Sequence, residues 1–154
     1  MSVAYYNFTD PRDGKIYPCV QMPDGKWWFA KNLSYATPNS HTYNDDPANE
    51  TIYGRLYTWD DLANACPSGC HIPTDDEWTA LTTAIGGDAG TKLKANSSLW
   101  STNTGTDVYG FSVLPAGERG NDGTFYSLGN YALFWSSSGS DASNAWIRYF
   151  GYAN

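Results

Sequence analysis

One stretch of the chain, from Tyr53 to Gly87, constrains the fold most because it is the only long run with the periodicity of helices. The residues before it alternate between apolar and polar as in a β-hairpin, and those after it form short apolar runs separated by turn residues. At 154 residues, the chain has the length of one domain. We therefore expect a single α+β domain over residues 1–154, with helices in the middle and strands on either side.

The first predicted helix begins after Thr58, whose hydroxyl group suits the N-cap position. Asp60 and Asp61 follow in the first turn, where the helix dipole favours negative charge. Pro67 ends this helix because proline lacks the N–H that would continue it. The apolar side chains that share one face are those of Trp59, Leu62, Ala63 and Cys66.

The second predicted helix has clearer boundaries. Thr74 and Glu77 have the spacing of a capping box, and Gly86 with Gly87 provides the C-terminal stop. A further helical turn is expected at residues 91–95. The buried stripe of the second helix is expected to comprise Trp78, Leu81 and Ile85.

Hairpin patterns dominate the N-terminal part. Residues 15–22 and 26–33 read as paired strands around the turn at residues 23–25, and residues 3–8 read as a short additional strand. Alternation places Trp27 and Trp28 on opposite faces of the return strand, so one of them is expected near the surface. Residues 34–51 are rich in turn formers and are predicted to form a loop with solvated acids rather than a calcium site.

The C-terminal half is predicted to contain four short strands joined by polar loops. They span residues 111–114, 124–128, 132–137 and 145–152, and the intervening loops include residues 115–123 and 138–144. No internal repeat of 20–50 residues is present. This half therefore reads as a set of small antiparallel pairings.

Charge and composition exclude some classes of function. The net charge is −7 and no basic stripe is present, which argues against nucleic-acid binding. No apolar run approaches the length of a membrane span, and residues 1–9 lack the pattern of a signal peptide. The 12 Tyr and 7 Trp, together with a low charged fraction, suit either a β-rich core or a recognition surface.

Three cysteines permit at most one disulfide within the chain. Cys66 and Cys70 lie four residues apart around Pro67 and Gly69, so we expect them to form a disulfide, with Cys19 left over. His71 beside them suggests a metal site as the alternative, but no second ligand cluster accompanies them. We therefore expect no metal ion and no cofactor.

Four motifs carry a specific resemblance to a known family. Residues 53–81 read YGRLYTWDDLANACPSGCHIPTDDEWTAL, and residues 106–138 read TDVYGFSVLPAGERGNDGTFYSLGNYALFWSSS. FTDPRDGKIY at residues 8–17 and KWWFAKNLSY at residues 26–35 agree with them. In this order the motifs resemble the Fibrobacter succinogenes major paralogous domain over nearly the whole chain.

The resemblance implies a fold and a setting. The family is similar to the formylglycine-generating-enzyme branch of the C-type lectin-like fold, which has two helices on a small twisted antiparallel sheet with long loops. Its members are mostly bacterial surface or secreted proteins without established chemistry, so an extracellular or cell-surface location is expected. The same fold serves as the variable, ligand-binding protein of diversity-generating retroelements, which is a further possibility for this chain.

The chain departs from the family pattern in three places. Thr42 and Glu50 stand where a cysteine pair is common, and Cys70 stands where tryptophan is usual. The usual last strand, approximately GFSVRCV, is absent after residue 154. We expect this absence to leave an open sheet edge, covered either by residues 1–10 as an extra strand or arm or by a neighbouring subunit, and truncation of the sequence is the third explanation.

A binding module is the expected function, and an enzyme is not. No G-x-S-x-G motif is present, His41 and His71 read as surface or turn residues, and no cysteine follows Cys70. The expected ligand is a protein or a glycan. The alternative is a structural subunit that forms an oligomer or filament through its open edge. The predicted ligand-binding residues are Arg119, Asn121, Asp122, Tyr126, Asn130, Tyr131, Ser140, Asp141, Asn144, Trp146, Arg148, Tyr149 and Tyr152.

Overall fold

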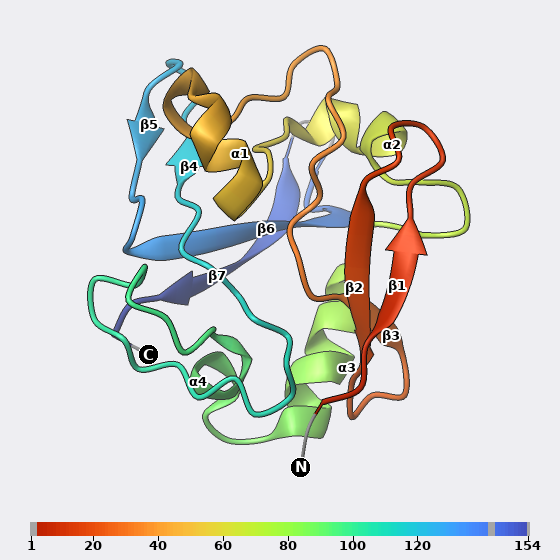
Figure 1. Ribbon diagram of the computed structural model, residues 1–154, viewed down its shortest axis with the longest axis vertical. Helices are drawn as coiled ribbons and strands as arrows, with labels where there is room; N and C mark the ends of the chain where they lie inside the picture. The colour runs from red at the N-terminus through yellow and green to blue at the C-terminus, as the bar shows by residue number, and fades with distance from the viewer. Residues whose placement is uncertain (1–2, 142–143, 154) are drawn as a thin grey trace.

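The structure is a computed structural model that describes residues 3–141 and 144–153 (Figure 1). Small antiparallel sheets and short helices make a mixed α and β fold, as predicted at this level. Residues 1, 2, 142 and 143 of the predicted arm and hairpin loop lie outside the described residues. The strands are β1 (Tyr6–Thr9), β2 (Ile16–Gln21), β3 (Trp27–Phe29), β4 (Glu118–Arg119), β5 (Phe125–Tyr126), β6 (Tyr131–Gly139) and β7 (Ala145–Gly151). The helices are α1 (Pro47–Tyr53), α2 (Leu62–Ala65), α3 (Asp75–Ile85) and α4 (Ala89–Leu93).

The N-terminal strands form a sheet in the order β1-β2-β3, which confirms the hairpin and the additional strand. The return strand is shorter than predicted because β3 spans only residues 27–29. Trp28 is buried and Trp27 is 55% exposed, so the alternation correctly predicted one tryptophan at the surface. Val20 and Met22 lie with Trp28 in the hydrophobic core.

Helix α3 supplies the centre of that core. Its capping box is present, with the Thr74 hydroxyl accepting from the Glu77 N–H and the Glu77 carboxylate accepting from the Thr74 N–H. The indole ring of Trp78 lies 4.9 Å from that of Trp28 and 5.6 Å from the ring of Phe134. Trp78 therefore joins the N-terminal sheet to the β6–β7 hairpin, and the predicted stripe of this helix is buried.

Helix α1 lies in a segment that we predicted to be loop, and that prediction is wrong. Asp46 is its N-cap and accepts a hydrogen bond from the Ala48 N–H, while Pro47 occupies the first turn. Both are helix-start signals, although their residue types are also typical of turns. Glu50 on this helix is not a solvated acid, since it accepts from Lys15 Nζ and the Ser34 hydroxyl at 2.9 Å each.

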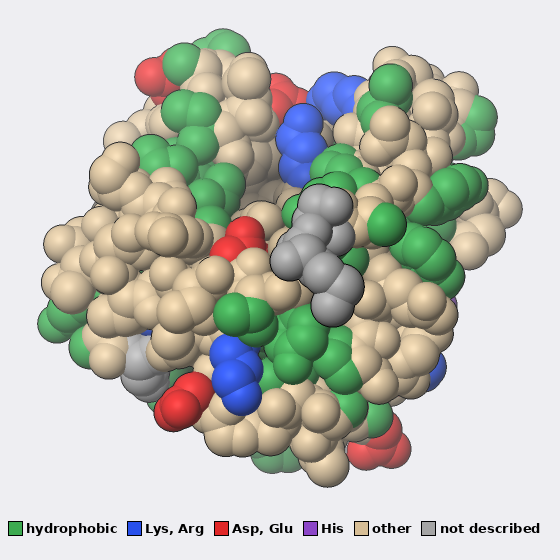
Figure 2. Space-filling model, turned by 60° about the horizontal axis from the view of Figure 1, so that its bottom comes forward, with side chains coloured by type: hydrophobic (Ala, Val, Ile, Leu, Met, Phe, Trp, Pro, Cys, Tyr) green, Lys and Arg blue, Asp and Glu red, His purple; other side chains and the backbone are tan. Residues whose placement is uncertain are grey.

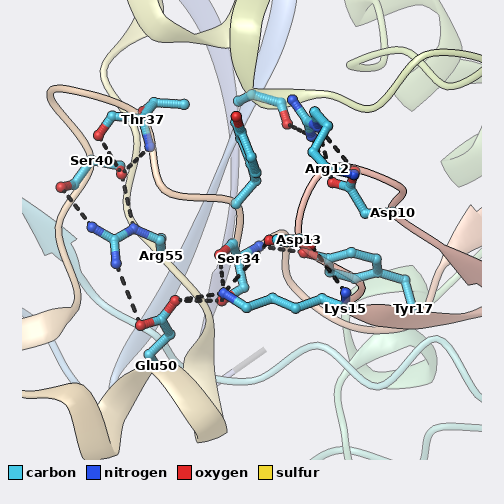
Figure 3. Close-up of polar contacts among 12 residues, drawn as sticks. Asp10, Arg12, Asp13, Lys15, Tyr17, Ser34, Thr37, Ser40, Glu50 and Arg55 are labelled. Atoms are coloured by element: carbon cyan, nitrogen blue, oxygen red, sulfur yellow. Dashed lines mark hydrogen bonds and ion pairs between the residues drawn. The ribbon is translucent and has the colours of Figure 1, made fainter.

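Figure 3 shows the polar network around Glu50, in which side chains from three segments converge. Arg55 contacts Glu50 at 3.4 Å and donates to both the hydroxyl and the carbonyl oxygen of Ser40. Tyr17, which is fully buried, accepts from the Ser34 N–H. The network therefore ties the β1–β2 hairpin to α1 and to residues 34–40.

The first predicted helix is much shorter than the pattern suggested. A 3₁₀ turn at Trp59–Asp61 leads into the four residues of α2, and Thr58 makes no side-chain cap. Ala63 is exposed and Cys66 lies beyond the helix, so the predicted stripe is wrong at those positions. The buried Asp61 instead accepts hydrogen bonds from Thr37 and Asn39, which draws it away from a helix-capping role.

The predicted strand at residues 111–114 is also wrong, because only Val113 forms a bridge there, with Lys94. Ser112 has a positive φ of 63°, which breaks an extended strand. Asp107 holds it in that conformation by accepting from both its N–H and its hydroxyl. In contrast, the predicted hairpin of β6 with β7 is confirmed, with Tyr131 opposite Gly151 and Trp135 opposite Ile147.

Candidate binding surface

The β6–β7 hairpin has one face turned to the core and one turned outward. Ala132, Phe134 and Phe150 pack on the core face. On a paired antiparallel hairpin, the alternate residues share the opposite face. That outer face consists of Tyr131, Leu133 and Trp135 on β6 and of Ile147 and Tyr149 on β7.

Three of the predicted ligand-binding tyrosines come together at one end of this outer face. The rings of Tyr149 and Tyr152 each lie 6.3 Å from that of Tyr131, with interplanar angles of 61° and 80°. Asn130, also predicted, adjoins them through the hydrogen bond from the Tyr152 N–H to its carbonyl. Because the rings meet edge to face, they do not form the flat platform on which a planar array of sugars would stack.

A large cleft adjoins the outer face of the hairpin. Its volume is about 1680 Å³ and its lining is mostly apolar. From the hairpin, Leu133, Trp135 and Ile147 of the outer face and Ala132 and Phe134 of the core face contribute to the lining. The N-terminal sheet contributes Tyr6, Phe8, Cys19, Trp27 and Phe29 from the face opposite to its core face, together with Trp28.

The N-terminal sheet has apolar side chains on both of its faces. One face packs on the core, and the other lines the cleft. Tyr6, Cys19 and Phe29 are direct cross-strand neighbours and therefore share the cleft face. Tyr6 and Trp27 remain more than half exposed, and their rings meet at 6.1 Å. Figure 2 shows a face of the molecule on which charged side chains are few and hydrophobic ones gather in separate groups.

The tip formed by β4 and β5 carries four more of the predicted residues. The Tyr126 hydroxyl donates to Asp122 at 2.7 Å, and the Arg119 guanidinium lies 5.7 Å from the ring centre of Phe125. Hydrogen bonds from the Thr124 N–H and from Tyr126 hold the pKa of Asp122 below its usual value. Arg119 and Asn121 line the large cleft, whereas Asp122 and Tyr126 are engaged with each other.

The loop residues Ser140, Asp141 and Asn144 form a separate group. The Asn144 side chain donates to both carboxylate oxygens of Asp141, and the Ser140 N–H donates to the Asn144 carbonyl. They lie at the opposite end of β6 from Tyr131, about 26 Å away at the usual rise per residue. Trp146, beside this loop, is 55% exposed. The predicted residues therefore form three groups and not one continuous surface.

Arg148 was predicted to contact ligand, but the structure gives it an internal role. Its guanidinium donates to the Asp75 carboxylate at 2.9 and 3.0 Å and to the Thr79 hydroxyl at 2.7 Å. Both partners belong to α3, whereas Arg148 belongs to β7. Arg148 therefore fastens the hairpin to the helix.

Comparison with known proteins supports the resemblance seen in the motifs. The model of the Fibrobacter succinogenes major domain family matches residues 23–154. The chain belongs to this family. No match was found among curated proteins or among solved structures. The family name specifies no activity, and β1 and β2 precede the range that matches the Fibrobacter succinogenes major domain.

The three cysteines of this Fibrobacter succinogenes major domain protein all line the cleft. Cys66 and Cys70 are free thiols in the structure, not the expected disulfide, and Cys19 is free and buried. Burial raises the pKa of Cys66 to about 11, and burial also raises that of Cys70. Both groups are therefore held as protonated thiols near neutral pH, the form that oxidises least readily.

Both histidines of the Fibrobacter succinogenes major domain contact acids. His41 lies 2.7 Å from Asp45, and His71 lies 2.8 Å from Glu77. Within residues 3–141 and 144–153, no group of three His, Cys, Asp or Glu side chains is arranged to hold a metal ion. No helix in that part of the chain is long and apolar enough to cross a bilayer.

The sequence motifs of the Fibrobacter succinogenes major domain did not reveal the cleft. Its walls come from segments more than 100 residues apart, so their meeting depends on tertiary packing. One local signal was available. Phe8, Cys19 and Phe29 are apolar on the face opposite to the buried Val20 and Trp28, which indicates a sheet with two faces to cover.

Proposed function

We propose that this Fibrobacter succinogenes major domain is a non-catalytic binding module for a polypeptide ligand. The ligand surface is the outer face of the β6–β7 hairpin together with the cleft beside it. The observation that carries the proposal is the row of apolar side chains on this face, in which Tyr131, Ile147 and Tyr149 are exposed and Leu133 and Trp135 are half-buried. Contiguous exposed apolar surface of this kind is typical of interaction sites.

The dimensions favour a polypeptide over a small molecule or a flat glycan. Pockets for small molecules usually enclose about 300–1,000 Å³, whereas this cleft has about 1680 Å³. The edge-to-face arrangement around Tyr131 offers ring edges and faces in several directions, which suits side chains better than stacked sugar rings. Tyrosine and tryptophan also supply contact area at low entropic cost.

Further features of the proposal concern setting and fold. We place the domain outside the cell or at the cell surface, and we assign it a lectin-like fold of the formylglycine-generating-enzyme branch. A role as the variable protein of a diversity-generating retroelement is consistent with Tyr131, Tyr149 and Tyr152 lying together at a surface. Adenine-rich codons at these positions, beside a near-repeat template, would support that role, and their absence would contradict it.

A display experiment tests the proposal. The immobilised protein is panned against a random 12-residue peptide library, and an array of glycans is probed in parallel. We expect peptides to be enriched and their binding to be lost in Ile147→Asp but kept in Val108→Asp, since Val108 is also exposed but lies outside the cleft. An absence of enriched peptides, or equal loss in both variants, contradicts the proposal.

Assembly into oligomers is the second candidate. The observation that favours it is that β1 and β7 each pair with one strand only among the described sheets, so each has an open edge. Light scattering coupled to size-exclusion chromatography over a wide range of concentrations distinguishes the two. A growing assembly supports this candidate, and a monomer throughout rules it out.

A further inference from the structure

We propose that a small pocket between β7 and the helices α3 and α4 binds the side chain of a lysine or arginine residue of the polypeptide ligand. This inference rests on the proposed function and deepens it by naming the chemistry of one ligand residue. Three observations carry it, namely the position of the pocket beside the outer face, its apolar floor and an unpaired carboxylate at its mouth.

The pocket lies where β7 meets two helices. Arg148 of β7 bonds to Asp75 of α3, and Lys94, directly after α4, donates to the Gly151 carbonyl at the end of β7 at 2.8 Å. In the view of Figure 1, α3 and α4 lie below β7. The space that remains between these contacts has a volume of about 340 Å³, and its walls come from α3, from β7 and from the start of α4.

The pocket adjoins the outer face of the hairpin. Tyr149 and Phe150 both line it, although consecutive residues of a strand point to opposite faces. The pocket therefore lies along the edge of β7, which pairs with β6 alone among the described sheets. Because Tyr149 belongs both to the pocket and to the outer face, a polypeptide on that face is in position to place one side chain in the pocket.

The size and the floor of the pocket suit a long side chain with an apolar stem. Trp78 and Phe150 line it and are 3% and 7% exposed, so they form its floor. A volume of about 340 Å³ is near the lower limit for small-molecule pockets and offers room for one side chain. Lysine and arginine pack their aliphatic stems on apolar surface of this kind while the charged group stays near water.

The charge at the mouth favours a cation. Asp88 is exposed, and its carboxylate caps no helix and forms no ion pair with any residue that the structure describes, Lys92 four residues further on included. Arg148 also lines the pocket, but Asp75 balances its charge. The pocket thus combines one unbalanced negative charge with the exposed ring of Tyr149, and both attract ammonium and guanidinium groups. The net charge of −7 acts in the same direction.

Single-residue probes test the chemistry of the pocket. The full chain is titrated with N-acetyl-lysine N-methylamide and with its norleucine and glutamate counterparts, and amide shifts are followed in ¹H–¹⁵N spectra. We expect saturable shifts at residues 88–91 and at Tyr149. The lysine probe should bind about fivefold more tightly than the norleucine probe, which has a similar stem without the charge.

Matched variants locate the effect. Asp88→Asn removes the charge and keeps a residue type that tolerates the positive φ of 60° at this position, so the preference for lysine should be lost without a change in fold. Asp76→Asn makes the same charge change at an exposed position of α3 outside the pocket and should keep the preference. Tyr149→Leu removes the ring and should weaken the lysine probe about threefold.

The library peptides provide a second readout. Peptides enriched by the parent protein should share a lysine or arginine at one position. Replacement of that residue by norleucine should weaken binding to the parent and to Asp76→Asn about fivefold, and should leave binding to Asp88→Asn nearly unchanged.

The outcomes separate this inference from the proposed function. Four results overturn the inference: no saturable shifts, equal affinity for the lysine and norleucine probes, tighter binding of the glutamate probe, or equal effects of Asp88→Asn and Asp76→Asn. The binding module stands in each case if library peptides are enriched. If the lysine probe binds as expected and no library peptide is enriched, the proposed function falls and the pocket remains a site for a basic group.

Discussion

Two regions of the molecule use polar and aromatic side chains in opposite ways. Around Glu50, side chains from the N-terminal hairpin, residues 34–40 and α1 bond to one another. On the outer face of the β6–β7 hairpin, Tyr131, Ile147 and Tyr149 remain exposed, and the exposed side chains of Lys31 and Arg119 line the cleft beside them. The difference teaches that hydrogen bonds between side chains stabilise the fold in the first region, whereas the exposed side chains of the second region can contact a ligand.

Among the changes considered, truncation of a core aromatic side chain should have the largest effect on the free energy of unfolding. Trp78 contacts Trp28 and Phe134 and is 3% exposed. Trp78→Ala should therefore lower the free energy of unfolding by about 3–5 kcal/mol through lost burial and a cavity. Urea denaturation followed by far-ultraviolet circular dichroism measures this. A loss below about 1 kcal/mol would show that this aromatic residue is not central to the fold.

Acid should weaken the fold through Glu77. Burial by itself would raise the pKa of Glu77, but hydrogen bonds from Lys26, the Thr74 N–H and His71 outweigh it and lower the pKa to about 2. A lowered pKa in the folded state means that the stabilisation is complete above the usual value of 4.5 and is lost as the pH falls toward 2. At 1.36 kcal/mol per pKa unit, the loss is at most about 3 kcal/mol.

Unfolding measured between pH 6 and pH 2 checks this prediction. Glu77→Gln should be less stable than the parent at pH 6 and should show a flatter dependence on pH. Asp76→Asn changes a neighbouring acid in the same turn of α3 and should keep the parent slope. Identical slopes for the parent and Glu77→Gln would show that another carboxylate carries the acid response.

Loss of the ion pair of Arg148 should have a smaller effect on stability. This substitution also tells whether Arg148 stabilises the contact with α3 or contacts a ligand. Its two hydrogen bonds to the Asp75 carboxylate are partly exposed, so Arg148→Ala should cost about 1 kcal/mol of stability. A double-mutant cycle with Asp75→Ala measures the coupling. Because Arg148 faces α3, ligand affinity should be unchanged in Arg148→Lys. A loss of affinity without a loss of stability would return this residue to the binding surface.

The sequence predicted elements where local signals are strong and failed where tertiary contacts decide. The Thr74–Glu77 capping box located α3, and two apolar runs separated by small polar residues located the β6–β7 hairpin. Helix α1 was missed because Asp46 and Pro47 suit a turn as well as a helix start. The strand expected around Ser112 is prevented by hydrogen bonds from Asp107, which no periodicity contains.

The candidate site was predicted less completely than the fold. The tyrosines around Tyr131 lie together because strand pairing brings Gly151 opposite Tyr131 and so places Tyr149 and Tyr152 nearby. The sequence did not reveal that Arg148 bonds to Asp75, because residue types do not tell which face of a hairpin meets a helix. The cleft could not be predicted, since it depends on how the second face of the N-terminal sheet is placed relative to β6.

Removal of a tyrosine from the outer face should have the smallest effect on stability. Tyr149 is 64% exposed, so Tyr149→Ala should change the free energy of unfolding by no more than about 0.5 kcal/mol. Binding of library peptides should nevertheless weaken at least about fivefold, since exposed aromatic side chains are frequent hot spots. Tyr109→Ala, which removes a tyrosine packed against the core, should show the reverse, with a clear loss of stability and unchanged affinity. If both variants lose stability equally, the outer face belongs to the core, and the contrast between the two regions fails.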